Sequence, residues 1–244
     1  MAANPEVRVS SINPEVHYKQ NIVATFNLLE AIRKYGGIET LIFTSSSTVY
    51  GEASVIPTPE DYAPLEPISV YGASKLACEA LIMGYAHSYG FNAVIYRLAN
   101  VVGPRSEHGV IYDFFWKLKR NPKELEILGD GTQKKSYLYV KDCVEAMLIG
   151  LKSLDKRVEI FNVGSEDQVD VKKIAEIVVK EMGLNDVKFR FTGGVDEGRG
   201  WVGDVKNMLL DVSKLKSKGW QARYNSEESV RLAIRSIVGK NDFS

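Results

Sequence analysis

Tyr71 and Lys75 stand four residues apart in the stretch SVYGASKLACEA, residues 69–80. Residues at this spacing share one face of a helix, so the phenol and the ammonium are expected side by side. A free tyrosine, with a pKa near ~10, is a poor base at neutral pH, but a nearby ammonium favours the phenolate. The pair could therefore act as a general base for a sugar or alcohol hydroxyl. The same spacing also occurs on exposed helices without any function, so the surrounding sequence must decide.

A helix is expected over residues 13–37, ahead of the pair. Asn13 can cap its first turn, Pro14 suits the first helical position, and Gly36 can end it. Its apolar residues recur at helical spacing, which gives the helix a face to bury.

Strands are expected on either side of the helix that carries the pair. That helix should cover about 69–90, and the short apolar runs 39–46 and 91–99 predict buried parallel strands. Residues 51–68 hold four prolines and predict an irregular loop. Alternating helices and strands are typical of a doubly wound α/β sheet, which is the fold class we expect.

Polar side chains gather where these strands end. Ser45–Thr48 close the first strand, Asn100 follows the second, and Tyr71 lies at the start of the helix between them. Ligands of open α/β sheets bind at the carboxyl ends of the strands. A ligand site is therefore expected at this edge.

The second half of the chain predicts a smaller α/β lobe. Helices are expected at 109–121, 141–153, 170–183 and 226–239, and strands within 125–140 and at 159–165 and 187–192. We expect the sheet domain to comprise residues 1–103 and 141–164, and the second lobe residues 104–140 and 165–244.

Composition excludes several classes of protein. Thirty-one basic and 31 acidic residues give a formal net charge of zero, so bulk charge predicts neither a nucleic-acid nor a membrane partner. Cys78 and Cys143 fit neither a disulfide framework nor a metal cluster, and the three histidines lack metal-ligand spacing, so no metal is expected. The chain lacks a long apolar run and the layout of a signal peptide, so a cytoplasmic protein is expected.

Several spaced segments resemble one known family, in the order in which that family carries them. They are TSSSTVYG (44–51), SVYGASKLACE (69–79), YRLANVVGPR (96–105), GDGTQKKSYLYVKDCVEAM (129–147), FNVGS (161–165) and GDVKNMLLDVSKLKSKGW (203–220). Together they resemble the extended short-chain dehydrogenase/reductases, and in particular the nucleotide-sugar epimerase/dehydratase branch. The resemblance implies a Rossmann-like dinucleotide-binding domain with NAD as cofactor and a lobe that binds a UDP-sugar.

The resemblance also assigns the catalytic residues. Tyr71 matches the catalytic base of the family, and Lys75 matches its partner, which also binds the nicotinamide ribose. Ser46 matches the hydroxyl that assists the tyrosine. Asn100 matches an asparagine that touches the nucleotide sugar, although a strand-ending turn residue is the plain alternative.

Further contacts follow from the same resemblance. Those implied for the cofactor are Ala2, Ala3, Asn21, Ser45, Tyr71, Lys75 and Leu98. Those implied for the substrate are Ser46, Tyr71, Asn100, Val110, Lys135, Arg199 and Asp204. Lys135 stands where the family has a diphosphate-binding arginine and lacks its bidentate fork. Trp201 takes the place of a second arginine, with Arg199 two residues earlier; both basic residues could equally be solvated surface charges.

The reaction implied is 4-epimerisation of a nucleotide sugar. The 4,6-dehydratases of the family carry an acidic pair directly after the catalytic hydroxyl, and here those places hold Ser47 and Thr48. Hydroxyls cannot act as acid and base near neutral pH, so elimination of water is disfavoured. Interconversion of UDP-glucose and UDP-galactose is the expected reaction, with a UDP-uronate as the alternative substrate.

The glycine-rich turn that holds the dinucleotide in this family has no counterpart in the sequence. No G-x-x-G-x-x-G is present, and MAANPEV resembles the end of the family's fourth strand. We therefore expect two N-terminal βαβ units to be absent, which leaves open a non-catalytic remnant that binds a nucleotide sugar or a partner. A homodimer is expected through the helices at 13–36 and 69–90, since both are apolar beyond one face.

Overall fold

A parallel sheet of three strands forms the centre of the computed structural model, which describes residues 4–241. Its strands are β1 (Thr40–Ser46), β2 (Asn92–Leu98) and β7 (Val158–Val163), in the order β1-β2-β7. Thr40 pairs with Asn92 and Ala93 with Val158, and all the strands run in one direction. The predicted pairing of the first two strands and the α/β fold class are thereby confirmed.

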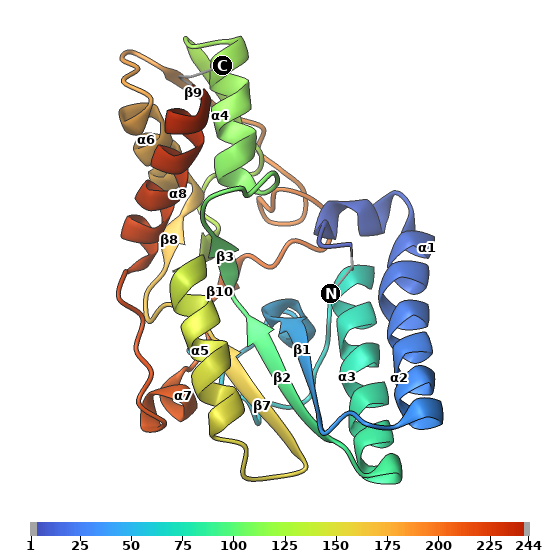
Figure 1. Ribbon diagram of the computed structural model, residues 1–244. Coiled ribbons are helices and arrows are strands. Elements are labelled where there is room, and N and C mark those ends of the chain that lie inside the picture. Colours follow the sequence, from blue (N-terminus) through green and yellow to red (C-terminus); the bar gives the residue numbers. More distant parts are fainter. Residues whose placement is uncertain (1–3, 242–244) are drawn as a thin grey trace.

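Helices cover both faces of this sheet, as Figure 1 shows. Ile95 on β2 packs into a cluster with Leu29 of α2 (Ala24–Tyr35) and Ile82 of α3 (Val70–Tyr89). Tyr96, the next residue along β2, packs with Ala146 of α5 (Val140–Lys152) on the opposite face. Alternate residues of a strand point to opposite faces, so the two clusters form separate layers of the core.

The helix expected over 13–37 is present but interrupted. It consists of α1 (Pro14–His17), a π-helical segment η2 (Tyr18–Val23) and α2. Pro14 takes the first turn as predicted, but the Asn13 side chain makes no capping hydrogen bond. Gly36, with φ of +63°, ends the helix as expected.

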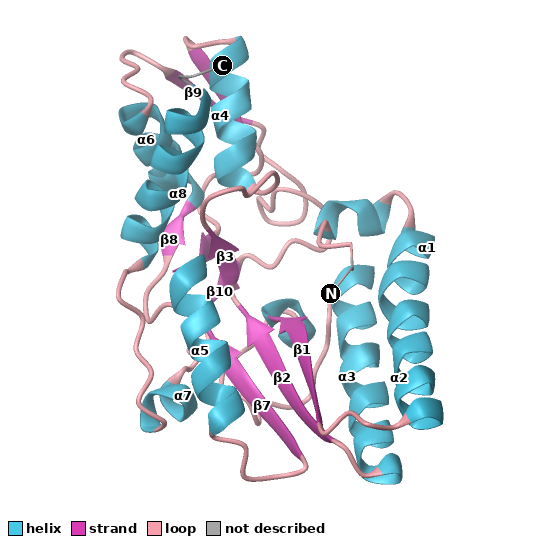
Figure 2. Ribbon diagram, in the orientation of Figure 1, coloured by secondary structure: helices cyan, strands magenta, loops and turns pink. Residues whose placement is uncertain are grey.

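Short strands and longer helices build the upper part of Figure 2. The helices are α4 (Val110–Arg120), α6 (Val171–Glu181) and α8 (Ser226–Asn241). The sheets pair β3 (Asn100–Val102) with β6 (Tyr137–Tyr139), β4 (Glu124–Ile127) with β9 (Lys188–Phe191), and β5 (Lys134–Lys135) with β8 (Val169–Asp170) and β10 (Asn207–Met208). The remaining short helices are η1 (Val7–Ser11), η3 (Ser47–Tyr50) and α7 (Ser213–Ser217). The proposed division into two domains stays a prediction.

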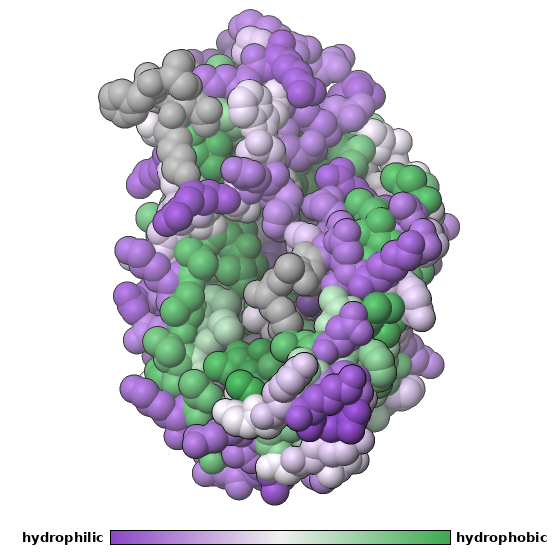
Figure 3. Space-filling model, turned by 45° about the vertical axis from the view of Figure 1, so that its right-hand side comes forward, coloured by the Kyte–Doolittle hydropathy of each residue, from purple (hydrophilic) through white to green (hydrophobic). Residues whose placement is uncertain are grey.

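Figure 3 shows a broad apolar area on one face of the molecule, with hydrophilic residues toward both ends. Exposed apolar side chains on α5 include Val144 and Leu148. Residues four apart lie on one face of the helix, so these two form an apolar stripe on α5. Among the described residues, no helix has both the length and the hydropathy to cross a membrane.

Candidate active site

A cavity of about 490 Å³ opens at the carboxyl ends of β1 and β2, where the sequence predicts a ligand site. It brings together most of the predicted residues. Those that line it are Ser45, Ser46, Tyr71, Lys75, Leu98, Asn100, Val110, Lys135 and Asp204. Asn21 and Arg199 are not among the lining residues, and Ala2 and Ala3 lie outside the described part of the chain.

The start of α3 is held close to the end of β1. Ser69 caps α3 by accepting a hydrogen bond of 3.1 Å from the backbone nitrogen of Gly72. A Cβ atom at Gly72 would lie 2.7 Å from the carbonyl oxygen of Thr48. Only glycine permits this approach, which places Tyr71 beside the serines that end β1.

Tyr71 is buried, with 9% of its surface exposed. Burial raises the pKa of its phenol because it penalises the charged form, while a hydrogen bond with Ser46 acts in the opposite direction. The sequence analysis expected Lys75 to lower this pKa. The net shift has the opposite direction, because loss of solvent dominates.

The Lys75 ammonium bonds a backbone carbonyl of β1 and lies over the Tyr71 ring. Its Nζ donates a hydrogen bond of 2.9 Å to the carbonyl oxygen of Thr44 and lies 5.9 Å from the centre of the Tyr71 ring. Burial lowers the pKa of Lys75. The two side chains share the cavity and lie side by side, as their spacing predicts.

Two further predicted cofactor residues differ in their bonding. Ser45 is 4% exposed, and its Oγ has no hydrogen-bond partner among the described residues. Asn21 is buried behind the cavity, where its Nδ2 donates to Ser74 Oγ at 2.8 Å and its Oδ1 accepts from the backbone nitrogen of Asn4. Asn21 thus ties the π-helical segment to α3, while Ser45 retains a free hydroxyl for a ligand.

The side chains of Lys135 and Asp204 form an ion pair inside the cavity. The Lys135 ammonium also lies 5.4 Å from the centre of the Trp201 ring, and Asp204 accepts a further hydrogen bond from the backbone nitrogen of Gly200. The lysine is therefore fixed on the cavity wall, where it can meet an anionic part of a ligand.

Arg199 faces another part of the molecule. Its Nη2 donates to Glu52 Oε1 at 2.8 Å and its Nη1 to the carbonyl oxygen of Asp196 at 2.9 Å. The guanidinium thereby joins the loop that carries Trp201 to the segment after η3. A diphosphate contact by Arg199 stays a prediction, and it requires that this ion pair open.

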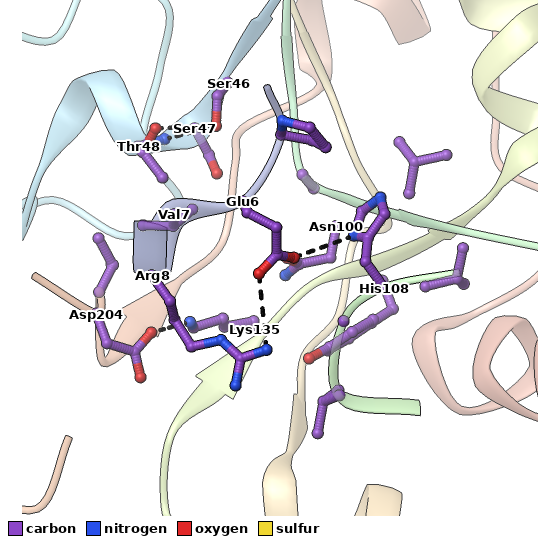
Figure 4. A pocket seen from close by; sticks show the side chains of 18 of the residues that line it. Glu6, Val7, Arg8, Ser46, Ser47, Thr48, Asn100, His108, Lys135 and Asp204 are labelled. Atoms are coloured by element: carbon purple, nitrogen blue, oxygen red, sulfur yellow. Dashed lines mark hydrogen bonds and ion pairs between the residues drawn. The ribbon is translucent and has the colours of Figure 1, made fainter. Parts of the chain in front are cut away.

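Figure 4 shows three cavity residues that the sequence analysis did not assign: Glu6, Arg8 and His108. A Glu6 oxygen lies 3.6 Å from Arg8 Nη2, and the other lies 3.7 Å from His108 Nδ1. His108 lies two residues before Val110, which the resemblance implies for the substrate, and Glu6 and Arg8 lie close to the N-terminus. The resemblance places the preceding Ala2 and Ala3 at the cofactor, but it assigns no role to Glu6 or Arg8.

Comparison with known proteins gives one consistent family. Residues 1–164 match the model of the NAD dependent epimerase/dehydratase family. A putative UDP-glucose 4-epimerase of Methanocaldococcus jannaschii is 34% identical over 245 residues, which cover 98% of this chain and 76% of that protein. A UDP-glucuronate 4-epimerase of Thermodesulfobacterium geofontis is 30% identical over 236 residues, covering 96% and 70% of the two chains.

A solved structure agrees with these relatives. A crystal structure of UDP-galactose 4-epimerase shares 47% sequence identity and superposes with a TM-score of 0.88, covering 98% of this chain and 76% of that one. The α/β fold with a cavity at the strand ends, the family match over more than half of the chain and this structural likeness agree. The chain belongs to the NAD dependent epimerase/dehydratase family.

Proposed function

We propose that this protein catalyses the NAD-dependent 4-epimerisation of a nucleotide sugar, UDP-glucose and UDP-galactose being the substrates. The observation that carries the proposal is the cavity in which Tyr71, Ser46 and Lys75 lie together. Ser47 and Thr48 stand where the dehydratases carry the acidic pair that eliminates water, and hydroxyls cannot replace that pair. The similarity to named 4-epimerases supports the same reaction.

Three residues of the lining suit the nicotinamide end of NAD. The unpartnered, buried hydroxyl of Ser45 can bond a polar group of the cofactor, and the Lys75 ammonium can bind its ribose hydroxyls. Leu98 offers an apolar contact at the end of β2. When bound, NAD supplies reversible acceptance of a hydride from the sugar.

The side chains of this protein move the proton. Tyr71 takes the proton of the sugar's 4-hydroxyl and returns it after the sugar has turned over. Ser46 stabilises the tyrosine oxygen by its hydrogen bond. Burial raises the pKa of Tyr71, and the positive charge of Lys75 in the same cavity favours its deprotonation.

Kinetics on single variants test this proposal. Conversion of UDP-galactose to UDP-glucose is measured with NAD present, for the wild type, Tyr71→Phe and Lys75→Met. Loss of a placed acid/base should lower the rate by roughly 10²–10⁴-fold in Tyr71→Phe while the ring still packs. Lys75→Met should lower the rate and weaken NAD binding. Full activity of Tyr71→Phe contradicts the mechanism, and a wild type that binds UDP-sugar without converting it favours the non-catalytic alternative.

We further infer a homodimer in the cytoplasm. On the outer side of α2 and α3, Phe26 lies 6.4 Å from Tyr85, whose ring lies 5.1 Å from that of Tyr89. Phe26 and Tyr89 are about half exposed, so this aromatic strip is available to a second copy. Cys78 and Cys143 are free thiols, which suits a reducing compartment. Sedimentation should show a dimer at micromolar concentration and a monomer for Tyr89→Glu, with Tyr35→Glu, outside the strip, as control.

A further inference from the structure

Glu6 places a carboxylate on the wall of the cavity. In Figure 4 its side chain lies beside Asn100, with Arg8 and His108 at its carboxylate oxygens and Ser46 across the cavity. The Glu6 side chain is 30% exposed, and its backbone nitrogen donates a 3.0 Å hydrogen bond to Asn4 Oδ1 just before η1. Its position is therefore set by the backbone as well as by the ion pairs.

The Glu6 carboxylate pairs with Arg8, a cation that an acidic ligand could otherwise bind. Among the described lining residues, Arg8, Lys75 and Lys135 are the arginine and lysine side chains. Lys135 pairs with Asp204, Lys75 bonds the carbonyl oxygen of Thr44, and Arg8 pairs with Glu6. A carboxylate on the sugar would thus find Arg8 already neutralised and would meet Glu6 as a like charge.

The sugar must lie near Glu6 for this repulsion to matter. The proposed reaction places C4 of the hexose at Tyr71. C5 is the neighbouring ring carbon, and it bears the C6 substituent. Glu6, Asn100 and Tyr71 line one cavity. With C4 at Tyr71, we place the C5 substituent against the part of the wall that Glu6 and Asn100 form. An uncharged C6 hydroxymethyl group can donate a hydrogen bond to a carboxylate, whereas a C6 carboxylate cannot.

We propose that Glu6 is a specificity-determining residue that admits UDP-hexoses with an uncharged C6 and excludes UDP-uronates. The inference rests on the proposed function for the location of the sugar. Specificity of this kind comes from a repulsive group that acts against the wrong ligand. Arg8 contributes to the same specificity, because removal of Glu6 would free its guanidinium to bind the carboxylate of a UDP-uronate.

Binding measurements test the proposal without relying on turnover. Calorimetry with NAD present gives the dissociation constants of UDP-glucose and UDP-glucuronate for the wild type and for Glu6→Gln. The wild type should prefer UDP-glucose, and Glu6→Gln should shift the ratio of the two constants at least tenfold toward UDP-glucuronate. In the double variant Glu6→Gln/Arg8→Met most of that shift should disappear, because the gain passes through Arg8.

Glu107→Gln is the matched control, because Glu107 is exposed next to His108, outside the cavity lining, and its loss changes the net charge equally. An unchanged ratio in Glu6→Gln, an equal shift in Glu107→Gln, or a wild type that binds both ligands equally overturns the proposal. Failure of the proposed function would appear separately, as a wild type that shows this preference but does not interconvert UDP-glucose and UDP-galactose.

Discussion

Arg97 and Glu79 form an ion pair that solvent does not reach. Arg97 Nη2 lies 2.8 Å from Glu79 Oε2, and the two side chains are 3% and 0% exposed. Arg97 Nη1 also donates to Tyr50 Oη at 3.0 Å and to the carbonyl oxygen of Glu60. Glu79 follows Lys75 by one turn of α3, so a single guanidinium ties α3, β2 and the segment after β1 together around the cavity.

The first prediction concerns this pair. Arg97→Met should destabilise the fold by about 3–5 kcal/mol, because it leaves the Glu79 carboxylate buried without a partner. The double variant Arg97→Met/Glu79→Leu should recover most of that loss, since no buried charge remains. Urea unfolding of the wild type and both variants measures the effect. Equal destabilisation of the two variants would show that lost packing, and not the unpaired charge, is responsible.

Sequence reasoning predicted the elements whose signals are local. Ser69 and Gly90 bound α3 as capping chemistry requires, and the apolar run 40–46 forms the expected strand. The contacts that tune the site join distant residues. Arg199 pairs with Glu52, 147 positions away, and the Lys75 ammonium meets a backbone carbonyl on β1 that no side-chain pattern reveals.

The π-helical turn at Tyr18–Val23 was missed for a related reason. Its residues have helical propensity, and the periodicity of the apolar face continues through it. What widens the helix there is tertiary packing, since Asn21 bonds Ser74 on α3 and the Asn21 carbonyl oxygen accepts from Cys78 Sγ. Such contacts appear only once the two helices are placed side by side.

The second prediction tests the close approach of α3 to β1. In Gly72→Ala the new Cβ would overlap the carbonyl oxygen of Thr48 and lie 3.0 Å from Pro67 Cβ, so α3 must shift. We expect the epimerisation rate to fall at least tenfold, because small displacements of a catalytic group have large effects. Gly84→Ala is the control on the same helix. Its Cβ meets open space, and it should stabilise the fold by roughly 0.5–1 kcal/mol.

The third prediction separates the two candidate diphosphate residues. Lys135 lines the cavity, whereas Arg199 is held by Glu52. Lys135→Gln should weaken UDP binding about tenfold, the usual effect of losing a charged contact worth ~1.4 kcal/mol. Arg199→Gln should change it less than about threefold. Comparable losses in both variants, measured by calorimetry with UDP, would show that Arg199 leaves Glu52 when the diphosphate binds.

The fourth prediction concerns His17, a buried residue whose ring meets that of Tyr71 edge to face at 5.5 Å. Burial is the largest cause of a pKa below the ordinary value of 6.5. In the unfolded chain the imidazole takes up a proton as the pH falls below about 6.5, while the folded protein resists it. The contribution of neutral His17 to the free energy of unfolding is therefore complete above that pH and is lost as the pH falls.

Replacing the imidazole with a ring that does not titrate should remove this dependence. His17→Phe retains an aromatic edge against Tyr71, so its melting temperature should fall less than that of the wild type between pH 7.5 and about pH 5.5, where histidine titrates. His87→Gln removes an imidazole at an exposed position of α3, outside the core, and should follow the wild type. Thermal unfolding by circular dichroism at several pH values measures the three curves. Parallel curves for the wild type and His17→Phe would mean that other groups cause the acid sensitivity, and that His17 beside the catalytic tyrosine serves packing alone.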